Sequence, residues 1–290
     1  MLTAHLKTHK TITFGQKIFC PYFYGDLHMS RFCPLFSGSG GNSTYISSAG
    51  CGILIDAGVS CKALLEALEN AGGDVKKLCA VAVTHEHSDH IKGLKPFLKK
   101  TGLPVAASAE TLAALESAGI IPVQNKTIPI GSEPIDFGGL CLSRFATSHD
   151  CNGSSGYVVT LSDGTKAGVC TDLGIVNDSV RDAIRGCGTL LIESNHDVEM
   201  LKRGPYPPQL KLRILSEKGH LSNSACSAEL AGLLKSGCTR FILGHISLHN
   251  NLPMLALSSA KAALLDAGAA ADRDYIITAA KPAGNGVVVF

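Results

Sequence analysis

The sequence VTHEHSDHIKGL, from Val83 to Leu94, gathers three histidines, one glutamate and one aspartate into six consecutive positions. It follows the apolar run LCAVAVT, which predicts a buried β-strand, and it leads into a short helix expected from Ile91 to Lys100. The polar cluster therefore lies where a strand ends and a helix begins, in the kind of connection that often carries binding and catalytic groups.

The spacing of these side chains favours metal binding. Side chains two residues apart on an extended segment point the same way, so we expect His85 and His87 to converge. Asp89 and His90 follow at the turn into the helix. Imidazole and carboxylate without thiolate form the ligand set of a borderline ion such as zinc, manganese or iron, whereas a purely structural zinc site is more often closed by cysteines. One turn can thus serve two metal ions.

Further candidate ligands follow other apolar runs. They are His149 in ATSHD, Asp172 in CTDLG and His245 in LGHIS. A single histidine is more often a satisfied core or surface group than a ligand. Here, however, all eight histidines beyond residue 28 lie at predicted strand ends or helix entries, and this shared placement favours a joint role.

The composition is that of a compact globular protein. The chain has 290 residues, of which 45% are hydrophobic and 17% charged, and its formal net charge of +2 neither demands nor excludes a polyanionic partner. No window reaches the roughly 18 apolar residues of a membrane helix, and no secretory signal pattern is present. We therefore expect a cytoplasmic protein without membrane contact. Eleven scattered cysteines without a CxxC pair predict buried free thiols.

The order of predicted elements indicates a layered α/β fold. Residues 1–28 show no sustained period, so we expect a poorly ordered extension and a natural start at Met29. Residues 29–290 are expected to form one domain that is strand-rich at first. Helices such as Ser222–Lys235 and Pro253–Asp266 then alternate with strands. That order predicts two sheets with helices on their outer faces.

The ligand order His-x-His-x-Asp-His, followed by a histidine, an aspartate and a final histidine, resembles the metallo-β-lactamase superfamily over residues 33 to about 250. The resemblance implies a four-layer αββα sandwich. It also implies that His85, His87 and His149 bind one metal, that Asp89, His90 and His245 bind the second, and that Asp172 bridges the pair. A metal-bound water has its pKa lowered toward about 7, which provides a hydroxide nucleophile, and a second metal can offset the developing charge. We expect two divalent ions, zinc or manganese, and hydrolytic chemistry.

Two branches of the superfamily do not match. Flavodiiron oxidoreductases carry a glutamate where His87 stands and need a flavodoxin domain for which the chain has no room. The β-CASP nucleases insert a large domain between the bridging aspartate and the last ligand, whereas Asp172 and His245 are only 73 positions apart.

The segment between these two ligands resembles RNase Z in outline and the bacterial WalJ/YycJ-type enzymes more closely. The motifs TDLG, IESNHD, GPYPPQLKLRI, GHLSN and GHIS carry the second resemblance, together with FCPLFSGSGGNSTYI and IDAG upstream. WalJ/YycJ-type enzymes are described as 5′ to 3′ exonucleases on double-stranded DNA. The resemblance implies that Glu193 and His220 form an acid pair, and we count Asp89, Glu193 and His220 as the candidate catalytic residues.

Phosphodiester hydrolysis needs transition-state stabilisation on the order of 20 kcal/mol, and a proton donor for the leaving oxygen would contribute to it. His220 oriented by Glu193 could be that donor, or it could be a helix-entry histidine with a structural hydrogen bond. Basic residues could hold DNA phosphates or form solvated helix faces. They are Lys92, Lys95 and Lys99 near the metal loop, and Lys202, Arg203, Lys211, Arg213 and Lys218 before His220.

The loop SGSGGNST, from Ser37 to Thr44, lacks the Gly-Lys-Ser/Thr ending of a P-loop. Its glycines fit a tight turn, although Ser39 or Asn42 could contact substrate. The leading hypothesis is a dinuclear metal-dependent phosphodiesterase, a 5′ to 3′ double-stranded DNA exonuclease. The alternatives are a thioester or lactone hydrolase of the same fold, an RNA-processing nuclease, and a metal-stabilised binding protein without turnover.

Overall fold

A computed structural model describes residues 30–290 of the protein. The expected extension over residues 1–28 and the expected start at Met29 lie outside the described residues.

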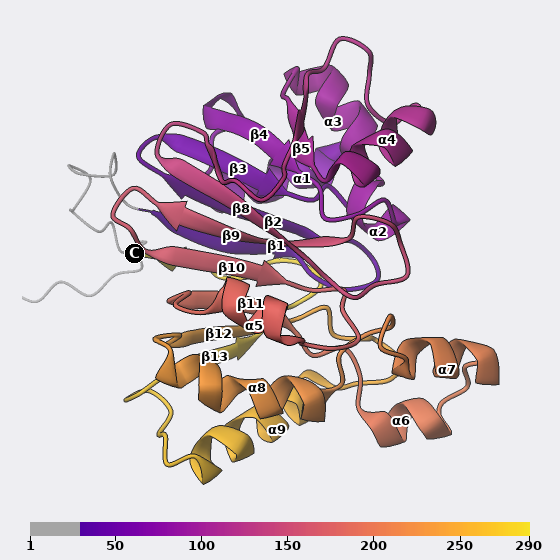
Figure 1. The fold of residues 1–290 in the computed structure, drawn as a ribbon, viewed down its shortest axis with the longest axis vertical. Helices are drawn as coiled ribbons and strands as arrows, with labels where there is room; N and C mark the ends of the chain where they lie inside the picture. The colour runs from indigo at the N-terminus through magenta and orange to yellow at the C-terminus, as the bar shows by residue number, and fades with distance from the viewer. Residues whose placement is uncertain (1–29) are drawn as a thin grey trace, which may run out of the picture.

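Two sheets of seven strands each form the centre of the structure (Figure 1). The first has the order β14 (Val288–Val289), β1 (Arg31–Phe36), β2 (Ser43–Ser48), β3 (Cys51–Ile55), β4 (Leu78–Ala82), β5 (Val105–Ala107) and β6 (Thr127–Pro129). The second has the order β13 (Ile276–Ala279), β12 (Arg240–Gly244), β11 (Thr189–Glu193), β10 (Lys166–Cys170), β9 (Ser155–Leu161), β8 (Leu140–Ala146) and β7 (Ile135–Asp136).

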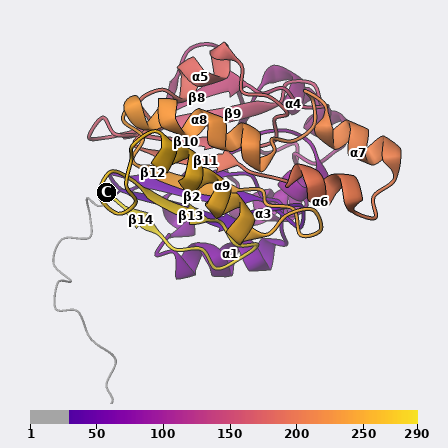
Figure 2. The same ribbon diagram turned by 90° about the horizontal axis from the view of Figure 1, so that it is seen from below.

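Helices cover the outer face of each sheet. The first sheet packs against α1 (Cys61–Asn70), α3 (Leu94–Thr101) and α4 (Ala109–Ser117). The second packs against α5 (Asp178–Ile184), α8 (Asn223–Lys235) and α9 (Pro253–Asp266), and Figure 2 shows α8 and α9 lying across it. None of the helices within residues 30–290 combines the length and apolar character that crossing a bilayer requires.

The side-chain period of the strands produces the layers. On β3, Ile53 and Ile55 point toward the second sheet and join an apolar cluster between the sheets, whereas Leu54 points outward and joins the cluster under α1 and α3. A third cluster lies between the second sheet and its helices. Three apolar layers separate four layers of structure, which confirms the predicted αββα sandwich.

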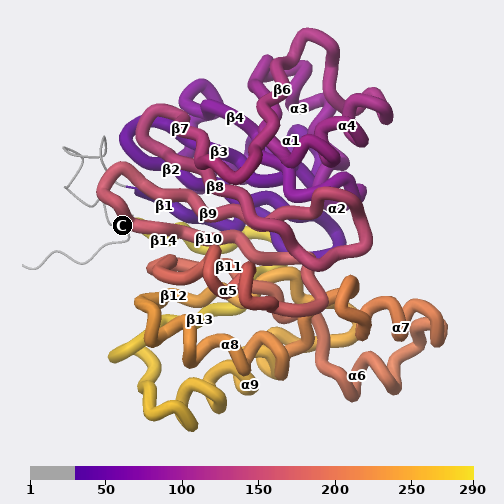
Figure 3. Tube along the Cα trace, in the orientation of Figure 1, coloured from indigo at the N-terminus to yellow at the C-terminus, as the bar shows by residue number. Residues whose placement is uncertain are grey.

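Strand direction places the functional loops at one edge. Strands β3 to β6 pair in parallel, as do β10 to β13. The carboxyl ends of parallel strands lie at the same edge of a sheet, and the loops that follow them form binding sites there. Three short helices, α2 (Ser88–Ile91), α6 (Val198–Arg203) and α7 (Pro208–Leu215), lie toward the same end of the molecule (Figures 1 and 3).

Helix boundaries differ from the sequence prediction at this end. The helix expected from Ile91 to Lys100 is two helices, α2 and α3, joined through Gly93. A Cβ at Gly93 would lie 1.9 Å from the carbonyl oxygen of Val59, so the neighbouring chain approaches too closely for a side chain. Helix α6 was not predicted, although Asp197 caps it by accepting from the backbone N–H of Met200.

The prediction of free cysteines is wrong for one pair. Cys51 and Cys79 form a disulfide with their Cα atoms 6.1 Å apart. The two residues are 28 positions apart in sequence, and only the parallel pairing of β3 with β4 brings them together. Eight other described cysteines are free, and five of these are buried as expected.

Candidate metal centre

Seven side chains converge at the loop-bearing edge, and each comes from a segment that follows a strand. After β4, the loop supplies His85 and His87 and helix α2 supplies Asp89 and His90, whereas the loops after β8, β10 and β12 supply His149, Asp172 and His245. Five of the seven side chains are buried, and two of these, His85 and His90, are 0% exposed. The structure therefore brings together every residue that the sequence analysis named as a metal ligand.

The first group consists of three imidazoles. His87 Nδ1 lies 3.0 Å from His85 Nε2 and 3.3 Å from His149 Nε2. On the far side of two of the rings, His85 Nδ1 lies 2.9 Å from Thr84 Oγ1, and His149 Nδ1 lies 3.2 Å from the carbonyl oxygen of Gly219. A proton held on the outer nitrogen leaves the inner lone pair free, which is the arrangement of histidine ligands of metals.

The second group adds a carboxylate. Asp89 Oδ2 lies 3.6 Å from the Nε2 atoms of both His90 and His245. Asp172 Oδ2 lies 3.4 Å from His90 Nε2, and Asp172 also has a ligand atom within 4.8 Å of those of His85 and His149. Asp172 thus stands between the two groups, at the position that a bridging carboxylate requires.

Asp56 contacts the segment 84–90 that carries the first four ligands, and it was not predicted from the sequence as a site residue. Its Oδ1 accepts from the backbone N–H of Thr84 at 2.8 Å, and its Oδ2 lies 2.8 Å from His90 Nδ1. Asp56 therefore fixes which nitrogen of His90 faces the centre. Asp56, Asp172 and His245 all adopt the left-handed conformation, with φ of 63°, 59° and 51°. Such backbone conformations cost energy in residues other than glycine and gather at functional sites.

The donor set fits divalent ions. Asp172 Oδ2 and His245 Nε2 are buried atoms that have no hydrogen-bond partner within the described part of the chain. Buried polar atoms are normally satisfied, and both of these atoms point into the ligand groups. Imidazole nitrogens and carboxylate oxygens suit zinc and manganese. Cations at the two groups would give these atoms their missing partners.

The electrostatics of the second group depend on its carboxylates. Burial acts to lower the pKa of His90, but the charges of Asp172 and Asp56 outweigh burial and raise the pKa to about 9. In the same way, Asp172, Asp89 and Glu193 overcome burial and raise the pKa of His245 well above its ordinary value. These shifts favour a proton on each of the two imidazoles when no ion is bound. Metal binding must displace these protons.

Glu193 occupies the end of β11 and is 0% exposed. Its Oε1 accepts from His220 Nδ1 at 2.9 Å and from His245 Nδ1 at 2.7 Å. Its Oε2 accepts from the backbone N–H groups of Leu173 and Leu221 at 3.0 and 3.1 Å. Burial acts to raise the pKa of Glu193, but His220 and His245 outweigh burial and hold the pKa well below its usual range. Glu193 is therefore an ionised anchor that positions two histidines.

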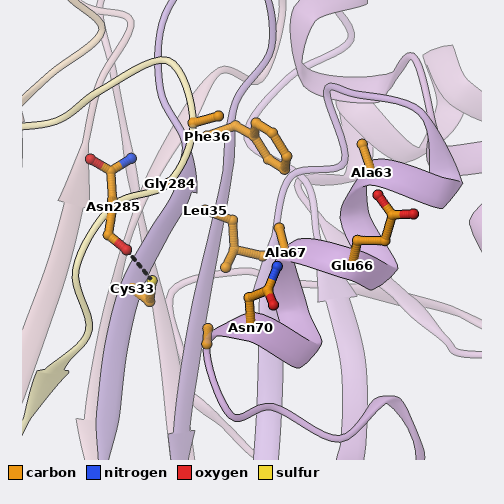
Figure 4. A pocket seen from close by; sticks show the side chains of 11 residues that line it. Cys33, Leu35, Phe36, Ala63, Glu66, Ala67, Asn70, Gly284 and Asn285 are labelled. Carbon is orange, nitrogen blue, oxygen red and sulfur yellow. Dashed lines mark hydrogen bonds between the residues drawn. The ribbon is translucent and has the colours of Figure 1, made fainter. Parts of the chain in front are cut away.

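A pocket of about 340 Å³ opens over the centre. Its lining includes the ligands His87, Asp89, Asp172 and His245 together with His220, Ser39, Ser88, Asn195, Tyr206, Leu210, Arg213, Ile214 and Ser247. A volume in this range is typical of sites for small ligands or single groups of a larger one. A second pocket, of about 330 Å³, lies between β1, α1 and residues 283–285 and contains none of the predicted site residues (Figure 4).

The structure places only some of the predicted substrate contacts at this pocket. Ser39 and Arg213 line the metal pocket. Asn42 is 7% exposed and contacts the ligands instead, with its Nδ2 donating to Asp89 Oδ2 at 3.3 Å. Lys202, Arg203 and Lys211 do not line this pocket, so their contact with substrate stays a prediction. Lys202 and Arg203 lie exposed on α6 and pair with Glu199, whereas Lys211 is half-buried on α7 and donates to the carbonyl of Lys202.

Two further residues beside the ligands, Asp150 and Cys151, were not found from the sequence. Asp150 lies 3.5 Å from His149 Nε2 and 3.7 Å from His87 Nε2, and it forms an ion pair with Arg213. The sequence could have indicated Asp150, because it directly follows the predicted ligand His149. Cys151 has its sulfur within 4.8 Å of the ligand atoms of His85 and His87.

Comparisons with known proteins agree with this geometry. A family model described as a beta-lactamase superfamily domain matches residues 52–246. Exodeoxyribonuclease YycJ of Bacillus anthracis is 37% identical over 239 residues, which are 82% of this chain and 90% of the relative. Exodeoxyribonuclease WalJ of Streptococcus pneumoniae is 34% identical over 229 residues, which are 78% of this chain and 85% of the relative.

The metallo-beta-lactamase fold protein YhfI of Bacillus subtilis superposes with a TM-score of 0.68 at 18% identity, covering 90% of this chain and 99% of YhfI. That likeness concerns the fold. The family model and the two relatives extend it to the sequence that forms the ligand loops. The chain therefore belongs to the metallo-β-lactamase superfamily of hydrolases, and within it to the family of the YycJ and WalJ proteins.

Proposed function

We propose that the protein is a dinuclear metal-dependent phosphodiesterase that degrades double-stranded DNA from its 5′ end. The observation that carries this proposal is the His220–Glu193 pair at the wall of the metal pocket. A buried carboxylate holds one nitrogen of an imidazole that borders the same cavity as the ligand groups. The names of the relatives YycJ and WalJ, both exodeoxyribonucleases, support a DNA substrate.

The residues have separate roles in this reaction. Divalent ions held by the two groups supply a nucleophile at neutral pH and offset the charge that develops on the phosphate oxygens. Glu193 Oε1 accepts from His220 Nδ1, so Nε2 is the nitrogen that faces the pocket and can pass a proton to the leaving oxygen. Asp172 fixes the relative position of the two groups. Asp56 keeps His90 in the required tautomer.

Arg213 supplies a guanidinium at the mouth of the pocket, where it is paired with Asp150. A phosphate of the substrate can replace Asp150 as the partner, because guanidinium groups bind carboxylates and phosphates with the same geometry. Arg213 would then hold a phosphate next to the scissile one. Exposed Lys202 on α6 and half-buried Lys211 on α7 add a general attraction for polyanions.

The main rival is a thioester or lactone hydrolase of the same fold. A thiolate leaves without help from a proton donor, so a thioesterase has no need of a positioned imidazole such as His220. The alkoxide that leaves a phosphodiester is far more basic and does need one. The His220–Glu193 pair therefore favours an alkoxide leaving group over a thiolate, and the names of the relatives favour a phosphodiester over a lactone.

The test uses full-length, metal-loaded protein with duplex DNA labelled at the 5′ end in one arm and at the 3′ end in the other. Single-stranded DNA, duplex RNA and an aryl thioester are the comparison substrates. His220→Ala should lose cleavage but keep its metal, whereas Asp172→Ala should lose both. Metal content is measured by mass spectrometry, and Glu66→Gln on the exposed face of α1 is the matched control. Rapid thioester cleavage with intact DNA would reject the proposal, and release of nucleotides from the 3′ end would reject its polarity.

A further inference from the structure

Tyr206 is an aromatic side chain at the metal pocket for which the proposed reaction has no use. It lies in the connection between α6 and α7 and is half-buried. Among the described residues that line the pocket, Tyr206 is the only tyrosine, and no phenylalanine lines it. The remaining lining is mostly polar, with ligands, His220 and Arg213. Tyr206 therefore adds an aromatic side chain to the apolar residues Leu210 and Ile214 in a mostly polar lining.

His249 supports this ring from outside the pocket. The ring centroids of Tyr206 and His249 are 5.9 Å apart, and their planes meet at 64°. The contact is edge-on, which is a favourable arrangement for aromatic pairs. Because the two rings do not stack in parallel, no face of the Tyr206 ring is covered by a parallel His249 ring.

The chain around Tyr206 is held in place. Pro205, Pro207 and Pro208 flank the tyrosine, and each fixes its own φ angle. A Cβ at Gly204 would lie 2.7 Å from Asn250 Oδ1, so the loop packs directly on the residue after His249. Proline and close packing reduce the entropy that a binding surface loses when ligand arrives.

The loop that carries His249 and Asn250 is tied to the metal centre through the segment before α6. Asp197 N–H donates to the carbonyl of Asn250 at 2.8 Å, and Ser247 N–H donates to the carbonyl of Asn195 at 2.8 Å. Asn195 Nδ2 in turn donates to the carbonyl of His245, also at 2.8 Å. Tyr206 contacts this loop through His249 and the packing of Gly204 on Asn250, and the loop in turn is hydrogen-bonded toward His245 of the second ligand group.

We propose that Tyr206, supported by His249, stacks on the nucleobase of the nucleotide that carries the scissile phosphate. This inference rests on the proposed function and identifies what the site recognises besides phosphate. Base–aromatic stacking tolerates every sequence because each base has a π-face. It therefore suits an enzyme that removes nucleotides one after another. In this arrangement, the polar side chains that line the pocket bind the phosphate, and Tyr206 stacks on the base.

The binding test uses duplex DNA with 2-aminopurine as the terminal base and the His220→Ala protein loaded with metal. Stacking quenches the fluorescence of 2-aminopurine. We expect quenching with His220→Ala and with the double variant that adds Tyr206→Phe, and loss of quenching when Tyr206→Ala is added. Leu212→Ala, on the exposed side of α7, is the matched control and should not change the signal. Equal fluorescence with and without Tyr206 would overturn the inference.

The kinetic test compares duplex DNA with the same duplex carrying an abasic site at its terminal nucleotide. Tyr206→Ala should lower kcat/KM on the normal duplex by about 10-fold or more and leave the abasic duplex unchanged. Tyr206→Phe should retain activity, because it keeps the ring and loses only the hydroxyl. If Tyr206→Phe is as impaired as Tyr206→Ala, a hydrogen bond replaces stacking and the inference is wrong. Failure of the wild-type protein to cleave any nucleic acid would instead reject the proposed function, while the fluorescence result still decides the stacking.

Discussion

Metal binding should release protons from the second ligand group. Carboxylates raise the pKa of His90 to about 9 and that of His245 well above its ordinary value, so both imidazoles carry an extra proton at pH 7.5 in the metal-free protein. A bound ion needs the lone pairs that these protons occupy. Each displaced proton makes the apparent affinity change tenfold per pH unit. Two protons therefore predict an affinity that rises by about 100-fold per pH unit between about pH 6.5 and 9.

Titration calorimetry in buffers of different ionisation enthalpy measures the protons directly, because the slope of heat against ionisation enthalpy equals the number released. We expect about two for wild type at pH 7.5, in addition to any proton lost by water. Asp56→Asn removes one of the carboxylates that raise the pKa of His90, and it should lower the count. Asp74→Asn, at an exposed position, should not change it. A wild-type count near zero, or identical counts in wild type and Asp56→Asn, would refute the reasoning.

The same shift fixes how the stability of the metal-free protein depends on pH. The folded-state pKa of His90 is raised, so its stabilising contribution is complete below the unfolded pKa of about 6.5 and is lost as pH rises through about 9. A difference between 6.5 and about 9 corresponds to about 3 kcal/mol. Denaturant unfolding with a chelator present should show this loss between pH 6.5 and 9. Unchanged stability across that window would count against the protonated His90.

Three further predictions concern single side chains. Glu193→Gln replaces a carboxylate that accepts four hydrogen bonds, so the free energy of unfolding of the metal-free protein in guanidinium at pH 7 should fall by about 3 kcal/mol. A fall of less than about 1 kcal/mol would contradict the role of Glu193 in positioning the two histidines. Arg213→Ala should raise KM for DNA more than it changes kcat. It should also reduce the slope of log binding constant against log salt concentration by about one. Exposed Lys100→Ala is the control, and an unchanged slope in Arg213→Ala would exclude a phosphate contact. Gly93→Ala should destabilise the protein by about 3 kcal/mol or more, because the added Cβ has no room. Gly232→Ala on α8 has open space around its Cβ and should stabilise the protein by about 0.5 to 1 kcal/mol. Thermal unfolding compares the two variants, and equal effects would contradict the packing at Gly93.

Local patterns were sufficient for most of the elements and for the ligand list. The histidine loop, Asp172 and His245 were identified because each follows an apolar run whose period marks a strand. The cap at Ser222 and the helix from Asn223 to Lys235 follow local rules as well. Such signals extend over a few residues, so sequence alone carries them.

The two covered faces of the sheets also follow from the sequence, because successive side chains of a strand point to opposite faces, so a continuous apolar run such as CGILI needs cover on both. Ile53 and Leu54 point to opposite sides of β3 for this reason alone. The break between α2 and α3 does not follow, because it depends on how closely Val59 approaches Gly93.

The sequence by itself determined which side chains could bind metal and in which order the strands and helices occur. Only the tertiary structure decided which distant residues meet. Asp56 holds His90 across 34 positions, Arg213 pairs with Asp150 across 63, and Tyr206 joins the pocket through loops that share no local pattern with it. The physical reason is that periodicity and capping depend on neighbours within a few residues, whereas these contacts depend on how two packed sheets bring separate strand ends to one edge.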